Sequence, residues 1–268
     1  MRITLIGHMT VRVELDGRAF LTDPWFGPHT WLERRLAPRA TPPALAPDEI
    51  SPVDALLVSH NHLDHLDDVS LDLARRWGCP VIGSLGAAQR AQRAGVREVV
   101  TLKRGERTTL GPVTLHAVAA EHPLASDAVG FVLIGNQTCY FSGDTRLTPS
   151  LLTDLEPFCL DVALVQGACA HYPLLGDDGM SLPQVAILAR RMRPRWIVPV
   201  HLHCAGKWLD RGAGIRIEMG NADRVQATLA EWTAALRAEG LGVQLLEPGQ
   251  PWEIDPNSVE REHRTWNV

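Results

Sequence analysis

The feature that most constrains this chain is a short apolar run that ends in a cluster of histidines and aspartates. Residues 55–58 read Ala-Leu-Leu-Val, as in a buried strand, and Ser-His-Asn-His-Leu-Asp-His follows directly. Because side chains alternate along an extended segment, we expect His60 and His62 to project to the same side and bind one cation. A turn after the second histidine would direct Asp64 and His65 toward a second cation. The cluster therefore predicts two adjacent metal ions at the end of a strand.

The alternative for this cluster is a chance string in which Asp64 only caps the following helix. The chain contains 11 histidines among 268 residues. At that frequency the pattern H-x-H-x-D-H should arise by accident in about one of a thousand such chains. The composition thus favours a metal site.

Composition and charge exclude several other classes of protein. A net charge of -5 provides no basic stripe for a phosphate backbone, so no nucleic-acid partner is expected. The five cysteines are scattered and never spaced C-x-x-C, which argues against a disulfide framework or a thiolate zinc site. The opening residues are strand-like and no apolar run reaches the ~20 residues of a transmembrane segment, so we expect neither a signal sequence nor a membrane span. We expect a cytoplasmic protein with a small-molecule substrate, and its Trp-rich loops leave room for a homo-oligomer.

The order of elements predicts one α/β domain over residues 1–256 and a polar tail over 257–268. An antiparallel meander opens the chain, and strands then alternate with helices. Helices are predicted over 69–77, 87–94, 181–192 and 221–239. Strands are predicted over 3–6, 11–15, 19–21, 55–58, 80–82, 99–102, 113–119, 131–134, 138–141, 162–165, 196–200 and 243–246.

Ligand-type residues follow four of these strands. His60, His122, Asp144 and His201 each lie just beyond the carboxyl end of a predicted strand. In α/β sheets this is the edge at which ligands bind. We therefore expect the four side chains to meet at one rim of the molecule.

Taken in chain order, four segments resemble motifs of the metallo-β-lactamase superfamily, and the resemblance covers nearly the whole chain. They are Ser59-His60-Asn61-His62-Leu63-Asp64-His65, Glu121-His122, Ser142-Gly143-Asp144-Thr145 and Pro199-Val200-His201. Three further segments are similar to a branch that includes ascorbate-6-phosphate lactonase and the phospholipase D acting on N-acyl phosphatidylethanolamine. They are Gly7-His8-Met9-Thr10-Val11, Thr22-Asp23-Pro24 and Leu246-Glu247-Pro248-Gly249. The resemblance implies an αβ/βα four-layer sandwich, in which helices flank two mixed β-sheets.

The resemblance also implies a set of metal ligands. The first metal would be held by His60, His62 and His122, the second by Asp64, His65 and His201, and Asp144 would bridge the two. Imidazole and carboxylate ligands suit two divalent ions, with Zn²⁺ expected first and Mn²⁺ or Fe²⁺ as alternatives. Water between two such ions is acidified to a near-neutral pKa and becomes the nucleophile. The redox di-iron branch has Glu in place of His62, so hydrolysis is favoured over oxygen or nitric-oxide reduction.

Three residues are candidates for proton transfer or orientation. Asp64 is expected to orient the nucleophile or to accept a proton, in addition to binding metal. His8 lies where the branch usually has a histidine. His203, two residues beyond the expected ligand His201, remains open as a general acid, a ligand or a bystander.

Substrate contacts are predicted from the loops. Trp25 lies at the start of a long loop rich in Pro and Ala, whose aromatic residues favour a lid over simple packing against the sheet edge. Lys207 and Arg211 belong to a basic, Gly-rich loop that starts at the predicted rim and could bind a phosphate or carboxylate. For His171, a substrate contact and an ordinary exposed position are equally open. Relatives often have His-Met where this chain has Gly179-Met180, so any contact made through that histidine is absent here.

These observations predict a metal-dependent hydrolase that cleaves a carboxylic ester, a lactone or a phosphoester. One alternative is a phosphodiesterase or nuclease of the tRNA-processing type, which the acidic charge balance opposes. Another is a metal-binding scaffold without turnover, which the complete ligand set opposes.

Overall fold

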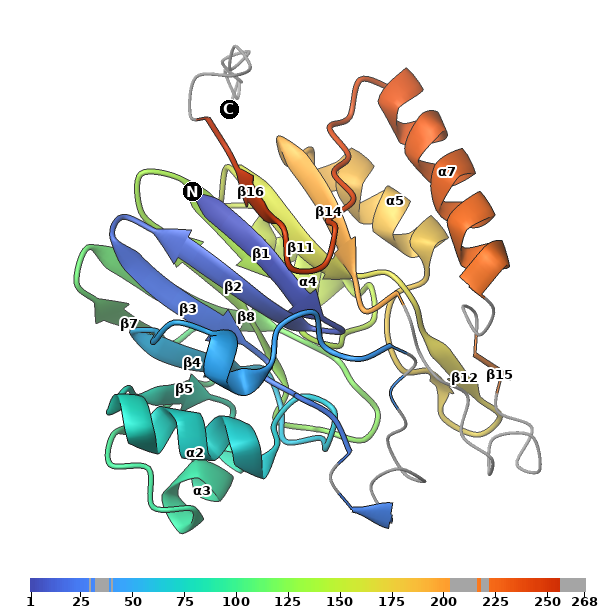
Figure 1. The fold of residues 1–268 in the computed structure, drawn as a ribbon. Coiled ribbons are helices and arrows are strands. Elements are labelled where there is room, and N and C mark those ends of the chain that lie inside the picture. Colours follow the sequence, from blue (N-terminus) through green and yellow to red (C-terminus); the bar gives the residue numbers. More distant parts are fainter. Residues whose placement is uncertain (29, 32–38, 40, 203–215, 218–221, 256–268) are drawn as a thin grey trace.

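The computed structural model describes residues 1–28, 30–31, 39, 41–202, 216–217 and 222–255 (Figure 1). Two large mixed sheets pack face to face, and helices cover their outer faces. The first sheet contains, in spatial order, β16 (Pro251–Glu253), β1 (Arg2–Gly7), β2 (Thr10–Leu15), β3 (Arg18–Thr22), β4 (Ala55–Val58), β5 (Val81–Gly83) and β6 (Val99–Thr101). The second contains β14 (Trp196–Val200), β11 (Val162–Gln166), β10 (Thr138–Phe141), β9 (Val129–Ile134), β8 (Val113–Ala119) and β7 (Arg107–Leu110). This arrangement confirms the predicted αβ/βα sandwich.

Strand direction brings the ligand-bearing ends to one edge. In the first sheet β4 runs parallel to β3 and β5. In the second sheet β11 runs parallel to β10 and β14. Because β8 and β10 are both antiparallel to β9, they run in the same direction as each other. The carboxyl ends of β8, β10 and β14 therefore lie at a common edge of that sheet.

Apolar side chains from both sheets form the central core. Phe20 and Leu57 of the first sheet and Phe131, Phe141 and Leu164 of the second are completely buried in one cluster. Burying a side chain of this size contributes about 1.5–3 kcal/mol. The strands whose ends carry the candidate ligands are thus held in a closely packed core.

Five helices of the described chain cover the outer faces. On the first sheet, α2 (Asp68–Trp77) and α3 (Leu85–Arg93) bury apolar residues against β4 and β5. On the second lie α4 (Pro149–Leu155), α5 (Leu182–Met192) and α7 (Ala222–Ala238). Asp67 caps α2 by accepting a hydrogen bond from the Ser70 amide, and Gly78 ends the helix at φ 66°. Among the described helices, none has both the length and the apolar composition required to cross a membrane.

Two smaller elements complete the described chain. A short 3-10 helix, η1 (Pro47–Glu49), precedes β4. A three-stranded sheet of β13 (Gly176–Asp177), β12 (Ala170–Tyr172) and β15 (Arg216–Ile217) lies beyond the end of the second large sheet (Figure 1).

The structure corrects the sequence prediction near the carboxyl end. The strand predicted over 243–246 is wrong, because Val243 makes only an isolated bridge to Ile197. The last strand is instead β16, which pairs antiparallel with β1. The strand β7 and the helix α4 were not predicted from the sequence. The predicted tail over 257–268 lies outside the described residues.

Candidate metal centre

Turns after the strands bring the predicted ligands to one edge of the sandwich. The first sheet supplies His8 from the β1–β2 turn and the histidine–aspartate cluster after β4. The second sheet supplies one residue after each of β8, β10 and β14. Together these residues are His8, His60, His62, Asp64, His65, His122, Asp144 and His201.

Three histidines form a first group of potential ligands. Their nearest nitrogens lie close together: His60 Nε2 is 2.9 Å from His62 Nδ1, and His122 Nε2 is 3.2 Å from the same atom. His60 is completely buried and His122 is 6% exposed. These are the residues predicted for the first metal. Each offers one ligand atom, and the three atoms lie within 4.8 Å of one another.

The hydrogen-bond partners of these imidazoles fix which nitrogens carry protons. Because a carbonyl oxygen only accepts, His62 Nε2 donates to Leu124 O (3.2 Å) and His122 Nδ1 donates to Asp178 O (2.6 Å). The Ser59 hydroxyl donates to Asp23, so His60 Nδ1 is the donor in its 2.9 Å contact with Ser59 Oγ. The remaining nitrogens then direct three lone pairs at one another.

Such an arrangement fits a cation. Three facing lone pairs repel one another, and neutral imidazole with its other nitrogen hydrogen-bonded is the usual form of a metal-binding histidine. Burial is the main factor that lowers the pKa of each of these three histidines, which favours the neutral form. Soft or borderline ions such as Zn²⁺ accept this set of ligands.

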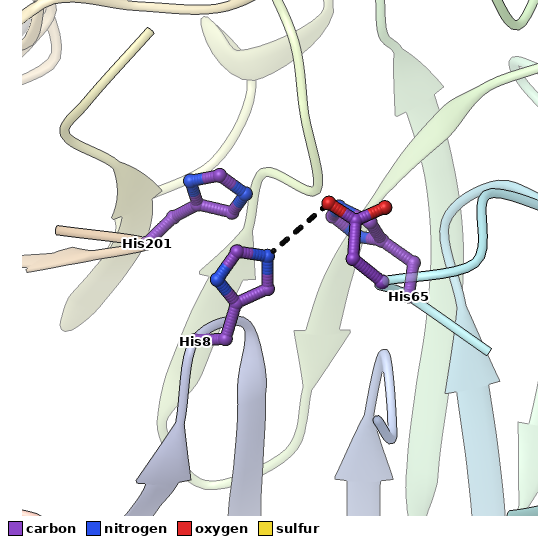
Figure 2. Close-up of side chains that lie close together, drawn as sticks. His8, His65 and His201 are labelled. Carbon is purple, nitrogen blue, oxygen red and sulfur yellow. Dashed lines mark ion pairs between the residues drawn. The ribbon is translucent and has the colours of Figure 1, made fainter. Parts of the chain in front are cut away.

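A second group combines histidines with an aspartate (Figure 2). The ligand atoms of His8, Asp64, His65 and His201 lie within 4.8 Å of one another. His8 Nε2 is 3.5 Å from Asp64 Oδ2, and the His8 and His201 rings are 3.8 Å apart at their centroids. This group contains the three residues predicted for the second metal, and it adds His8.

Asp144 lies between histidines of the second group. Its Oδ2 is 3.1 Å from His65 Nε2 and 3.7 Å from His201 Nε2. Its Oδ1 is buried and has no hydrogen-bond partner among the described residues. Burial alone would raise the pKa of Asp144, but His65 and His201 outweigh it and hold the pKa well below its ordinary value. A carboxylate in this position suits the bridging role predicted for Asp144.

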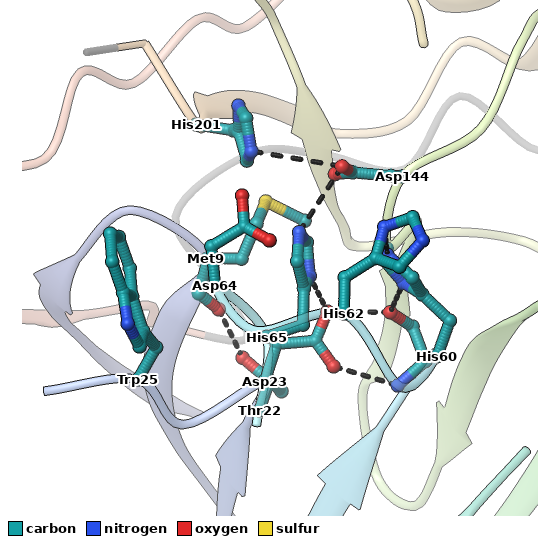
Figure 3. A network of polar contacts seen from close by, with 12 residues as sticks. Met9, Thr22, Asp23, Trp25, His60, His62, Asp64, His65, Asp144 and His201 are labelled. Atoms are coloured by element: carbon teal, nitrogen blue, oxygen red, sulfur yellow. Dashed lines mark hydrogen bonds and ion pairs between the residues drawn. The ribbon is translucent and has the colours of Figure 1, made fainter. Parts of the chain in front are cut away.

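Sequence reasoning did not identify Asp23 as a site residue, although it noted the motif that contains it. Asp23 is completely buried and accepts hydrogen bonds from the Ser59 amide (2.7 Å), Ser59 Oγ (2.6 Å) and His65 Nδ1 (2.7 Å) (Figure 3). The bond to His65 leaves Nε2 of that ring facing Asp144. Its contacts with residues 36 and 42 positions away are invisible to local sequence patterns.

The charge on His65 depends on these two carboxylates. Burial alone would lower the pKa of His65, but Asp144 and Asp23 outweigh burial and raise it well above its ordinary value. The raised pKa favours a proton on His65 Nε2. An ion held by this nitrogen would have to displace the proton, so its binding would weaken at low pH.

The other predicted site residues have diverse environments. Trp25 is 2% exposed and packs edge-on against His8, with ring centroids 4.9 Å apart. His171 on β12 is half-exposed, and its Nδ1 lies 2.8 Å from Asp177 Oδ1. Their substrate contacts stay predictions, as do those of Lys207 and Arg211. Those two residues and His203 lie outside the described residues.

Comparison with known proteins agrees with this picture. The family described as "Beta-lactamase superfamily domain" matches residues 18–202. The UPF0173 metal-dependent hydrolase of Carboxydothermus hydrogenoformans is 28% identical over 262 residues, covering 93% of this chain and 98% of that relative. The corresponding hydrolase of Pyrobaculum arsenaticum is 30% identical over 208 residues, covering 75% of this chain and 84% of that relative.

A solved structure has the same fold. The crystal structure of a possible metal-dependent hydrolase from Veillonella parvula has a TM-score of 0.75 at 19% identity, covering 95% of this chain and 99% of that chain. Because the family match spans most of the chain and the four-layer fold agrees with it, this protein belongs to the metallo-β-lactamase superfamily and is a metal-dependent hydrolase of that superfamily.

Proposed function

We propose that this hydrolase uses a dinuclear metal site to cleave a carboxylic ester or lactone, or a phosphoester. The observation that carries the proposal is the convergence of two groups of potential ligands at one edge of the sandwich. His60, His62 and His122 would hold one ion, and Asp64, His65 and His201 the other. When bound, the two ions would supply an acidified water as nucleophile and positive charge to stabilise the leaving group.

The protein's own groups orient this chemistry. Asp23 fixes the ring of His65, and the Leu124 and Asp178 carbonyls fix those of His62 and His122. Asp64 is the carboxylate at the more open side of the centre, with a side chain 32% exposed. We propose that it binds metal and accepts a proton from the attacking water.

The segments similar to ascorbate-6-phosphate lactonase and to N-acyl phosphatidylethanolamine phospholipase D support a lactone, ester or phosphoester as the substrate. In this chain they contain His8 and Asp23, both of which lie in or beside the second ligand group. Zn²⁺ is the metal proposed first, with Mn²⁺ and Fe²⁺ as alternatives.

The test is a hydrolase screen of the metal-reconstituted protein against lactones, aryl esters, bis-aryl phosphates and phosphomonoesters. We expect turnover with one of these classes, and a fall of at least about 10²-fold in Asp64→Asn. The matched control is Asp68→Asn, because the Asp68 side chain is 88% exposed and pairs with Arg90 outside the metal centre. Turnover that survives Asp64→Asn, or that is independent of metal, would contradict the proposal.

A further inference from the structure

We propose that His8 is an additional protein ligand of the second metal ion, so that this ion is held by three histidines and two aspartates, one of them the bridging Asp144. The inference rests on the dinuclear site proposed above, and it assigns a role to a residue outside the superfamily ligand set. Figure 2 shows His8 beside His201, and the dashed line from His8 marks its ion pair with the Asp64 carboxylate.

The first support is the position of the imidazole nitrogen. His8 Nε2 lies 3.5 Å from Asp64 Oδ2 and within 4.8 Å of ligand atoms of His65 and His201. The His8 side chain is only 8% exposed. Its Nε2 has no hydrogen-bond partner in the part of the chain that the structure describes. Leaving a buried polar atom without a hydrogen bond destabilises the folded state, and a bound cation would remove that cost.

The second support is the backbone. His8 has φ 57° and His201 has φ 58°, a left-handed conformation that residues other than glycine rarely adopt. The His201 amide donates to the His8 carbonyl (3.2 Å), which joins the β1–β2 turn to the turn after β14. An unfavourable backbone at a histidine persists where the surrounding structure holds it, and such positions cluster at functional sites.

The third support is the packing behind the ring. Trp25 lies edge-on to His8 at 4.9 Å, and the Arg39 guanidinium lies 4.5 Å above the Trp25 ring. The packed side chains of Trp25 and Arg39 restrict rotation of the His8 imidazole away from Asp64. A fixed imidazole loses little freedom on binding an ion, so it is well suited to act as a ligand.

The decisive variant is His8→Gly. Glycine adopts positive φ without strain, so the substitution removes the imidazole and keeps the turn. We would titrate metal-free protein with Co²⁺, following bound metal by its visible absorption and by competition with a chelator. The wild type should bind two ions. His8→Gly should bind one ion with unchanged affinity and the other at least about 10-fold more weakly.

Added imidazole separates a ligand from a structural residue. If His8 donates a nitrogen to the ion, imidazole should restore the second affinity and the wild-type absorption in His8→Gly. The control is His116→Ala on β8, a histidine that packs against Phe158 and lies outside the groups of potential metal ligands. It should bind two ions as the wild type does.

The outcomes are distinguishable. Two ions bound by His8→Gly with wild-type affinities would overturn the role of His8 and leave the dinuclear site intact. Weaker binding that imidazole does not restore would also overturn it, since a positioning role alone gives that result. A wild type that binds only one ion would contradict the proposed function itself.

Discussion

At the residue scale, the candidate centre is built on an unusual backbone. Within the described residues, five that are not glycine have positive φ, and three of them are His8, Asp23 and His201. Each supplies or supports a ligand of the second group. The left-handed conformation turns a side chain sharply away from the strand direction, and it is tolerated where the surroundings hold it in place. The candidate ligands could be named from the sequence, but these turns could not.

Asp23→Asn tests how far that second group depends on its support. Both carboxylate oxygens of Asp23 accept hydrogen bonds, but the NH₂ group of the new asparagine can only donate. It would therefore face a donor of Ser59 or His65, and His65 would lose its fixed orientation. We expect affinity for the second ion to fall about 10–100-fold, measured by competitive titration with Zn²⁺. The control is Asp54→Asn. Asp54 likewise accepts a hydrogen bond from a backbone amide, that of Ala19, and it lies away from the site. Equal loss of metal affinity in both variants would contradict a specific role for Asp23.

At the element scale, strands that are recognisable from their local sequence were predicted accurately, whereas a strand defined by pairing with a distant segment was not. The strands over 113–119, 138–141 and 196–200 were predicted with their observed bounds, because each is a short, mainly apolar segment of the second sheet. β16 was missed since it has three residues, begins with proline, and is defined only by pairing with β1 at the other end of the chain. The same limit applies to Asp23, whose partners are distant in sequence.

The contact between α4 and β8 gives a prediction at this scale. Asp154 on α4 accepts hydrogen bonds from Arg104 (2.7 Å) and from the Ala119 amide (2.8 Å) at the end of β8, shortly before His122. The Arg104 bond is the main factor that lowers the pKa of Asp154 below its ordinary value of 3.8. A lowered pKa means that the carboxylate stabilises the folded state above that pH, and this stabilisation is lost as the pH falls.

We therefore expect Asp154→Asn to reduce the free energy of unfolding by about 1 kcal/mol at pH 7. Most of this loss should come from the hydrogen bond with the Ala119 amide, because Arg104 is exposed and solvent weakens its ion pair. The difference from the wild type should shrink as the pH falls below 3.8. Urea unfolding at several pH values measures it. A difference that is constant from pH 7 to pH 3 would show that the ionised carboxylate is not the stabilising group.

At the scale of the whole molecule, the proposed ions would join the two sheets. The first sheet supplies His8 and the cluster after β4, and the second supplies His122, Asp144 and His201. Both ligand groups in the centre draw on both sheets. A bound ion would then oppose separation of the layers, in addition to its role in hydrolysis.

Removal of metal should accordingly lower the melting temperature. An ion present at about 100 times its Kd adds about 2.7 kcal/mol to the free energy of unfolding. For a chain of this size that corresponds to roughly 5–10 °C for each ion. Calorimetry of chelator-treated protein, before and after Zn²⁺ is restored, should show this shift. His122→Ala removes a ligand from the first group only, so its metal-dependent shift should be about half that of the wild type. If fully metal-free protein melts at the same temperature as the reloaded protein, ions do not join the two sheets, and the convergence of ligands serves chemistry alone.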